Sequence, residues 1–261
     1  KGTIGIITYL RTDSTRVADE AVTMAADYIK DNYGEKYLST AKTGGKDAKK
    51  IQDAHEAIRP TDIALSPVVV KESLSRDQFR LYQLIWKRFT ASQMSGAVYE
   101  TTSVKIAAGK YRFNVSASKI IFDGFMSVYK DEDEEKDGNT LVKSINTDSV
   151  LSLDNLESSQ HFTQPPAHFT EASLVKQLEE LGIGRPSTYA PTITTIIARH
   201  YIAKENKNLY VTELGEAVND IMKKAFPTIV DVNFTANMEA LLDGVAEGEV
   251  KWKEVIRNFY P

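Results

Sequence analysis

The stretch ITYLRTDST, residues 7–15, places a tyrosine two positions before an arginine. A phenol has a pKa of about 10, so a tyrosine that acts as a nucleophile needs help to lose its proton. The guanidinium of Arg11 favours a nearby phenolate, and it can bind the phosphodiester oxygens on which negative charge grows during attack. In an extended segment, Tyr9 and Arg11 would share one face and reach one phosphate. The pair by itself also fits a core tyrosine beside a surface arginine.

A second stretch, GIGRPSTYAPTITTIIARH over residues 182–200, has the residue types of a phosphate site. Glycines flank a predicted turn, a proline follows the arginine, and two hydroxyl residues open a predicted helix. The first turn of a helix offers free backbone amides to an anion. A capped helix with solvated arginines fits the same residues. The candidate phosphate contacts are Arg185, Ser187, Thr188 and, three turns further along, Arg199.

The stretch HEAIRPTD, residues 55–62, carries a histidine and an arginine four positions apart. If the segment is helical before Pro60, His55 and Arg59 share a face and can bind a phosphate together. His55 can also carry a proton near neutral pH. In isolation, the segment fits a single buried histidine that bonds to the backbone better than either of these roles. The four histidines of the chain match no zinc motif.

The elements that would position these residues are predicted first from helical periodicity. Tyr9 would end a short strand, and Asp13 or Ser14 would cap the amphipathic helix predicted over 17–34. A further helix begins after Ser75, which forms a capping box with Gln78. Its apolar stripe consists of Tyr82, Ile85, Trp86 and Phe89.

Between residues 99 and 153 the apolar period changes to two, which predicts antiparallel hairpins. One hairpin turns at 107–110, and a further strand is expected at 150–153. Beyond the Pro165-Pro166 pair, helices follow Thr170 and the 182–188 turn, and residues 201–212 indicate a hairpin. Two more helices are predicted before Phe226 and after Thr235. This order of elements is typical of a winged helix-turn-helix.

Composition excludes some classes of protein. The 261 residues contain no cysteine, so a disulfide framework and thiolate zinc sites are excluded. No apolar run reaches the roughly 20 residues that span a bilayer. The net charge is −4, but residues 131–137 hold six acids and one base and contribute −5 by themselves. Charge therefore neither favours nor forbids a nucleic-acid partner.

Taken together and in order, these segments resemble bacterial DNA topoisomerase I, a type IA topoisomerase, over essentially the whole chain. The matching segments are ITYLRTDST (7–15), HEAIRPTD (55–62), Asp123-Gly124-Phe125, PPAHFTEASLVKQLEELGIGRPSTYA (165–190) and FTANME (234–239).

The resemblance implies roles for single residues. Tyr9 matches the active-site tyrosine, which forms a covalent 5′-phosphotyrosine with DNA and permits resealing without ATP. Arg11 matches an arginine that assists at the scissile phosphate, and His55 matches a histidine of the active-site neighbourhood. The residues expected to contact DNA are Thr12, Arg59, Arg185, Ser187, Thr188 and Arg199.

The resemblance also implies a fold, an α+β multidomain architecture that forms part of a toroid. Residues 1–95 are expected to be a helical domain with winged-helix character that carries the tyrosine. Residues 96–165 are expected to be a β-rich arch. Residues 166–261 are expected to be a helical, winged-helix-like base domain.

We expect the chain to be a fragment that lacks the family's Toprim domain and zinc-ribbon modules. The Mg²⁺ ligands would lie in the Toprim domain, so no metal site is expected here and the fragment alone is expected to be inactive. The expected partner is single-stranded DNA within negatively supercoiled duplex. We expect a monomer without membrane contact, in the bacterial cytoplasm with the nucleoid.

Other functions remain open at this point. Topoisomerase III and reverse gyrase share the type IA motifs. A non-catalytic winged-helix DNA-binding module explains residues 165–261, but it gives no role to ITYLRTDST or HEAIRPTD. A tyrosine recombinase also forms a phosphotyrosine, but that class places its tyrosine after its arginines and histidines, whereas Tyr9 precedes them here.

Overall fold

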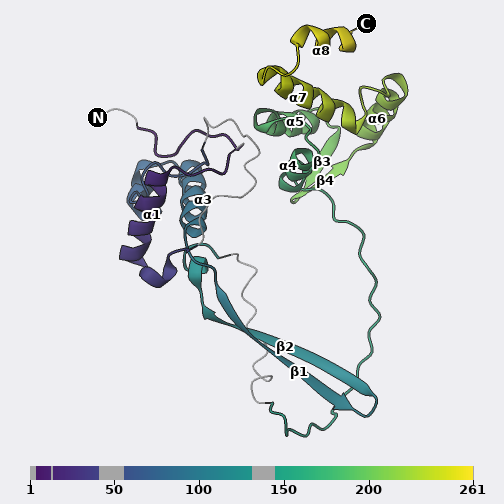
Figure 1. Ribbon diagram of the computed structural model, residues 1–261. Coiled ribbons are helices and arrows are strands. Elements are labelled where there is room, and N and C mark those ends of the chain that lie inside the picture. Colours follow the sequence, from purple (N-terminus) through teal and green to yellow (C-terminus); the bar gives the residue numbers. More distant parts are fainter. Residues whose placement is uncertain (1–3, 13, 41–55, 131–144, 261) are drawn as a thin grey trace. The chain divides into compact units, whose positions relative to one another are not determined.

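The computed structural model describes residues 4–12, 14–40, 56–130 and 145–260 and divides the chain into two compact units, residues 1–157 and 158–261 (Figure 1). Among the described residues, each unit combines helices with one two-stranded antiparallel sheet. The predicted α+β class is therefore confirmed. The structure groups the predicted β-rich arch with the first helices, and the division into three domains stays a prediction.

Helices α1 and α3 supply most of the buried core of the first unit. The helix α1, Asp19–Asn32, confirms the amphipathic helix predicted over 17–34. Gly34 follows its end with φ 99°, a backbone conformation that favours glycine. The helix α3 spans Arg76–Ser92, and the short elements between the two are η1 (Glu35–Tyr37), α2 (Pro67–Val70) and η2 (Lys71–Ser73). The buried cluster consists of Ala21, Ala25, Ile63, Val70, Tyr82, Trp86 and Phe89.

The start of α3 matches the predicted capping box. The amide of Gln78 donates to the Ser75 hydroxyl at 3.3 Å, and the amide of Ser75 donates to the Gln78 side chain at 3.0 Å. Two otherwise unpaired donors of the first turn are thereby satisfied. The prediction was accurate because a capping box depends only on residues three positions apart.

Two aromatic side chains of α3 hold the loop that follows the HEAIRPTD motif. The indole N–H of Trp86 donates to the carbonyl of Ile63 at 2.8 Å, and the hydroxyl of Tyr82 donates to the carbonyl of Leu65 at 2.6 Å. Both rings are at most 5% exposed. This loop is therefore fixed against the core of the first unit.

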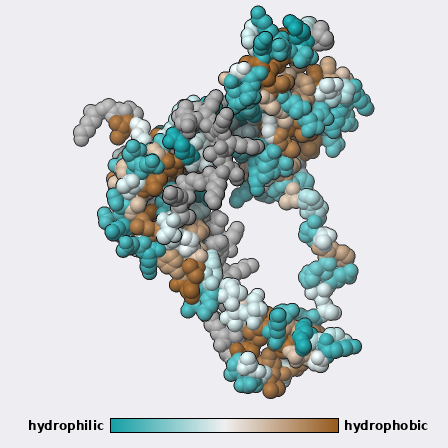
Figure 2. Space-filling model, in the orientation of Figure 1, coloured by the Kyte–Doolittle hydropathy of each residue, from teal (hydrophilic) through white to brown (hydrophobic). Residues whose placement is uncertain are grey.

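The predicted hairpin is present and long. Strands β1, Val98–Ala108, and β2, Tyr111–Phe122, pair antiparallel around Gly109 and Lys110. Apolar side chains of the two strands reach the surface (Figure 2), and Tyr111, Phe113 and Ile121 are between 44% and 63% exposed. An isolated two-stranded hairpin is only marginally stable in water. The hairpin therefore depends on the way its base is attached to the helices.

Hydrogen bonds join the base of the hairpin to the helical part of the first unit. The Tyr37 hydroxyl donates to the Asp123 carboxylate at 2.7 Å, and the Phe125 amide donates to the Ser95 carbonyl at 2.9 Å. Gly124, which opens η3 (Gly124–Ser127), has φ 49°, and a Cβ there would lie 2.5 Å from the Ser95 carbonyl oxygen. Only glycine allows this close approach.

The strand predicted at residues 150–153 is absent. Residues 145–169 contain no strand among the described residues, and Val150 is 96% exposed. A strand persists only where a neighbour accepts its backbone hydrogen bonds. Alternating apolar residues in this segment have no such neighbour in either two-stranded sheet.

The second unit confirms the predicted order of helix, turn, helix and hairpin. Thr170 and Ser173 form a capping box at the start of its first helix. The seventh helix begins at Val232, three residues before Thr235, because Asp231 caps it. The elements are α4 (Glu171–Glu180), α5 (Pro186–Ala198), β3 (Ile202–Glu205), β4 (Asn208–Val211), α6 (Glu213–Ala225), α7 (Val232–Ala246) and α8 (Trp252–Phe259).

Candidate active site

The two motifs of the first unit, about fifty residues apart in sequence, lie side by side. The amide of Thr8 donates to the carbonyl of Arg59 at 2.9 Å, and the amide of Thr61 donates to the carbonyl of Ile6 at 3.0 Å. The predicted strand before Tyr9 is nevertheless reduced to a single β-bridge, between Ile7 and Pro60. A ladder would pair the amide of Arg59 with the carbonyl of Thr8, but this amide donates to the Thr8 hydroxyl instead.

Tyr9 follows the last of these backbone bonds, and its side chain is 74% exposed. The amide of Arg11 donates to the carbonyl of Tyr9 at 2.9 Å, which closes a three-residue turn around Leu10. The segment from Tyr9 to Arg11 is therefore turned rather than extended, and the expectation that both side chains share the face of a strand is wrong. Arg11 is half-buried and Thr12 is exposed.

Helix α1 does not begin with the predicted cap. The N-cap is Ala18, whose methyl group cannot accept a hydrogen bond. Ser14 is buried, and its hydroxyl accepts from the amide of Arg16 at 3.2 Å, so it closes a local turn instead. The other predicted cap, Asp13, lies outside the described residues.

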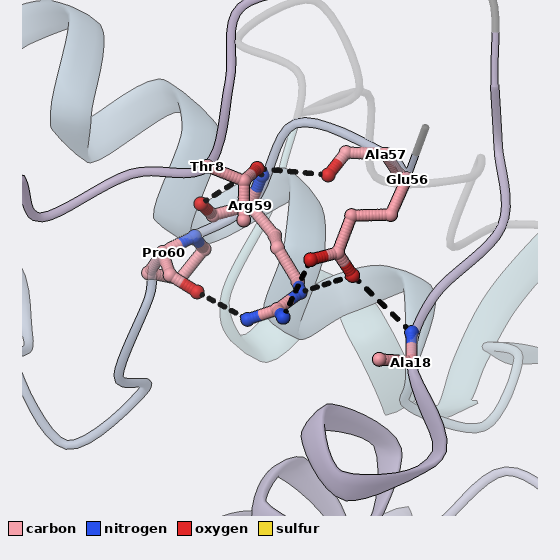
Figure 3. A network of polar contacts seen from close by, with 6 residues as sticks. All are labelled: Thr8, Ala18, Glu56, Ala57, Arg59 and Pro60. Carbon is pink, nitrogen blue, oxygen red and sulfur yellow. Dashed lines mark hydrogen bonds and ion pairs between the residues drawn. The ribbon is translucent and has the colours of Figure 1, made fainter. Parts of the chain in front are cut away.

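A carboxylate from the HEAIRPTD motif binds the backbone amide of the N-cap residue of α1. Glu56 Oε2 accepts a hydrogen bond from the amide of Ala18 at 3.3 Å (Figure 3). The same carboxylate binds Arg59 through two bonds, from Nε at 3.1 Å and from NH2 at 2.9 Å. Such a bidentate pair fixes the planes of both groups. Glu56 thus joins the start of α1 to the loop that holds Tyr9.

Arg59 is engaged by protein groups on several sides. Its NH1 donates to the carbonyl of Pro60 at 3.0 Å, and its side chain is 13% exposed. Its backbone amide donates to the Thr8 hydroxyl at 2.9 Å, and that hydroxyl donates to the carbonyl of Ala57 at 2.9 Å. The DNA contact predicted for Arg59 stays a prediction, and the geometry gives the residue a second role.

Sequence reasoning missed Thr8 and Glu56. Glu56 and Arg59 are three positions apart, a spacing at which opposite charges meet, so a signal for the pair was present. No sequence pattern indicated that Thr8 would contact residues about fifty positions away. His55, the predicted proton carrier, lies outside the described residues.

In the second unit, Arg185 is the N-cap of α5 and its guanidinium is paired. NH2 lies 2.5 Å from Asp243 Oδ2, NH1 lies 3.6 Å from Glu239 Oε2, and NH1 also donates to the carbonyl of Gly184 at 2.9 Å. The side chain remains 36% exposed. Both carboxylates belong to α7, so the predicted phosphate ligand lies within an ion-pair network between two helices.

The other predicted DNA contacts of this unit are on the surface of α5. Thr188 forms a reciprocal cap with Arg185: its hydroxyl accepts from the Arg185 amide at 2.9 Å and donates to the Arg185 carbonyl at 3.0 Å. Ser187 is exposed in the first turn, and Arg199 is exposed directly after the helix. The positions suit contact with a phosphate backbone, and the contacts themselves stay predictions.

Among the residues that the structure describes, no group of three or more histidine, aspartate or glutamate side chains could hold a metal ion. Over the same ranges, no helix has the length and apolar character needed to cross a membrane.

The sequence matches the family model of DNA topoisomerases over residues 3–257. The chain belongs to the DNA topoisomerase family. It is also similar to a solved structure, full-length topoisomerase I from Thermotoga maritima, with 40% sequence identity and a TM-score of 0.77. That match covers 98% of this chain and 41% of the Thermotoga chain. The chain thus spans less than half the length of this topoisomerase.

These matches confirm the resemblance to bacterial type IA topoisomerases. The family match spans both units, so Tyr9, Arg11 and Arg185 all lie within the matched residues. The match to the Thermotoga fold covers 98% of this chain, so it includes both the helical unit with its hairpin and the second unit.

Proposed function

We propose that this chain carries the nucleophile of an ATP-independent type IA topoisomerase, which cleaves one DNA strand, passes the other through the break and relaxes negative supercoils. The observation that carries the proposal is the placement of Tyr9. Its side chain is 74% exposed, yet the residue before it makes three hydrogen bonds of 2.9 Å to the HEAIRPTD segment. An accessible phenol on a held segment is what a nucleophile requires.

In the proposed step, the Tyr9 oxygen attacks a phosphorus of the DNA backbone. The bond between Oη and phosphorus forms and the bond from phosphorus to O3′ breaks, which leaves a 5′-phosphotyrosine and a 3′-hydroxyl. The phenolic proton passes to a base, for which we propose His55, and the leaving O3′ gains a proton. Arg11 binds a non-bridging oxygen as negative charge grows on it. The reverse step reseals the strand without ATP because the linkage replaces one phosphodiester by another.

We propose that residues outside 1–261 hold the Mg²⁺ that the family implies. The chain's match to only 41% of the Thermotoga enzyme supports this. When bound, Mg²⁺ would stabilise the charge of the phosphate. Residues 1–261 alone are then expected not to relax supercoiled DNA, and relaxation by them in the presence of Mg²⁺ would contradict this part of the proposal.

We propose single-stranded DNA in negatively supercoiled duplex as the partner, bound by a monomer in the bacterial cytoplasm with the nucleoid. Family membership supports DNA as the partner. Cationic and hydroxyl groups at a helix start suit a phosphate backbone. The proposed contacts are Thr12, Arg185, Ser187, Thr188 and Arg199.

The test uses the full-length protein and its Tyr9→Phe variant. Each is mixed with end-labelled single-stranded DNA and Mg²⁺ and denatured, and covalent adducts are separated by electrophoresis. We expect an adduct at the 5′-phosphate with the wild type and none with Tyr9→Phe. Tyr111→Phe is the matched control, because Tyr111 is 63% exposed on β2. An adduct that survives Tyr9→Phe would refute the assignment of the nucleophile.

A further inference from the structure

We propose that Thr8, Glu56 and Arg59 form a clamp that sets the position of Tyr9 during strand cleavage. The three act through Tyr9 and do not touch the reacting atoms, so they are positioning residues. This inference rests on the proposed function. Arg59 would position Tyr9 instead of contacting DNA, and Thr8 and Glu56 would have the same positioning role.

Thr8 is the point at which the clamp meets the nucleophile. Its amide donates to the carbonyl of Arg59, and its hydroxyl accepts from the amide of Arg59 and donates to the carbonyl of Ala57, each at 2.9 Å. All three bonds belong to the residue directly before Tyr9. The backbone of Tyr9 can therefore shift only as far as these bonds allow.

Glu56 and Arg59 keep the other side of the clamp in place. Their side chains are 25% and 13% exposed, and they share two hydrogen bonds. Loss of one partner would leave the other charge largely buried and unpaired, which is unfavourable. Glu56 also binds the amide of Ala18, so the pair is fixed to the start of α1, whose buried residues belong to the core.

The pairing also argues against Arg59 as a phosphate ligand. The guanidinium already binds a carboxylate with the fork geometry that a phosphate would use. A phosphate would have to displace Glu56, and the displaced carboxylate would then repel it. The paired charges cancel, so the clamp attracts DNA weakly while it orders the segment that carries the phenol.

Tyr9 needs such a device because no regular element holds it. The chain forms one β-bridge before it and a three-residue turn after it, and its side chain projects into solvent. A nucleophile that is misplaced by about 1 Å can lose about a hundredfold in rate. Hydrogen bonds on the preceding residue restrict the segment without covering the phenol.

The first test compares Thr8→Val, which removes the hydroxyl at nearly constant volume, with Thr8→Ser, which keeps it. In the full-length protein, single-turnover cleavage is measured at saturating single-stranded DNA, and the dissociation constant is measured separately. We expect Thr8→Val to slow cleavage by about tenfold or more with an unchanged dissociation constant, within the range for a misplaced group. Thr8→Ser should restore most of the rate. Cleavage by Thr8→Val at the wild-type rate would refute the clamp.

The second test separates positioning from phosphate binding at Arg59. Arg59→Lys keeps the charge but loses the bidentate bond, so the clamp predicts slower cleavage with an unchanged salt dependence of DNA binding. A phosphate ligand predicts nearly normal cleavage by Arg59→Lys, and for Arg59→Gln a salt slope reduced by about one. Nearly normal cleavage by Arg59→Lys together with a reduced salt slope for Arg59→Gln would refute the clamp. Arg80→Lys, on the exposed side of α3, is the matched control and should change neither quantity.

Amide hydrogen exchange makes the clamp testable even without cleavage. Exchange at the amides of Thr8 and Arg59 should accelerate about tenfold or more in Glu56→Gln relative to Arg80→Lys, because a weakened clamp opens more often. Unchanged exchange would refute the clamp whatever the protein catalyses. A second outcome is faster exchange in Glu56→Gln together with no covalent DNA adduct from the wild type. This outcome would refute the proposed function. The clamp would then be a purely structural feature, and its role in cleavage would be refuted as well.

Discussion

The guanidinium of Arg185, at the start of α5, lies 2.5 Å from the carboxylate of Asp243 on α7. Glu239, one turn earlier on α7, lies 3.6 Å from the same guanidinium. One positive and two negative charges leave this cluster with a net charge of −1. A cluster of that sign does not attract a phosphate unless the guanidinium exchanges a carboxylate for it. Arg185 can therefore make the proposed DNA contact only if its guanidinium releases a carboxylate and binds a phosphate in its place.

Asp243→Asn should strengthen binding of single-stranded DNA. The change removes one negative charge and weakens the competitor of the phosphate, so we expect affinity to rise about two- to tenfold at low salt and the gain to shrink as salt screens the charges. Fluorescence anisotropy with labelled DNA measures both. Asp220→Asn, on α6, is the control for loss of one acid. Weaker binding by Asp243→Asn would show that Asp243 holds Arg185 in its binding position.

Gly215→Ala should destabilise the second unit. Alanine ordinarily improves a helix by about 1 kcal/mol over glycine, but a Cβ at position 215 would lie 2.0 Å from the carbonyl oxygen of Tyr201. Backbone must therefore move, and we expect a loss of about 2 kcal/mol or more in the free energy of unfolding. Urea denaturation followed by circular dichroism measures this loss. Gly96→Ala, whose Cβ would meet no atom within 4 Å, should change stability little.

Tyr82 should make the first unit sensitive to alkaline pH. Burial, with a smaller effect of the Asp62 carboxylate, raises the pKa of Tyr82 from 10.0 to about 12. The folded state thus favours the neutral phenol, so this stabilisation is complete below pH 10 and is lost as pH rises toward 12. Over this interval, the free energy of unfolding of the wild type should fall more steeply with pH than that of Tyr82→Phe. At pH 7 the variant should be less stable by about 1 kcal/mol, because the Leu65 carbonyl loses its donor. Parallel pH slopes would contradict the prediction.

The sequence by itself determined the features that depend on near neighbours. The capping boxes at Ser75 and Thr170 follow from residues three positions apart, and the β1–β2 hairpin follows from alternation around a glycine turn. Helix periodicity located α1 within two residues at each end. The motifs also identified the family, because their order along the chain is specific even where each motif alone is not.

Only the tertiary structure decided how the candidate site is held. The contacts of Thr8 with Arg59, of Glu56 with Ala18 and of Arg185 with Asp243 join residues 38 to 58 positions apart. Hydrophobic periodicity reports which face of an element is buried, but not which polar groups of distant segments meet. The strand expected before Tyr9 failed for the same reason, since the amide of Arg59 donates to the hydroxyl of Thr8 and not to its backbone carbonyl.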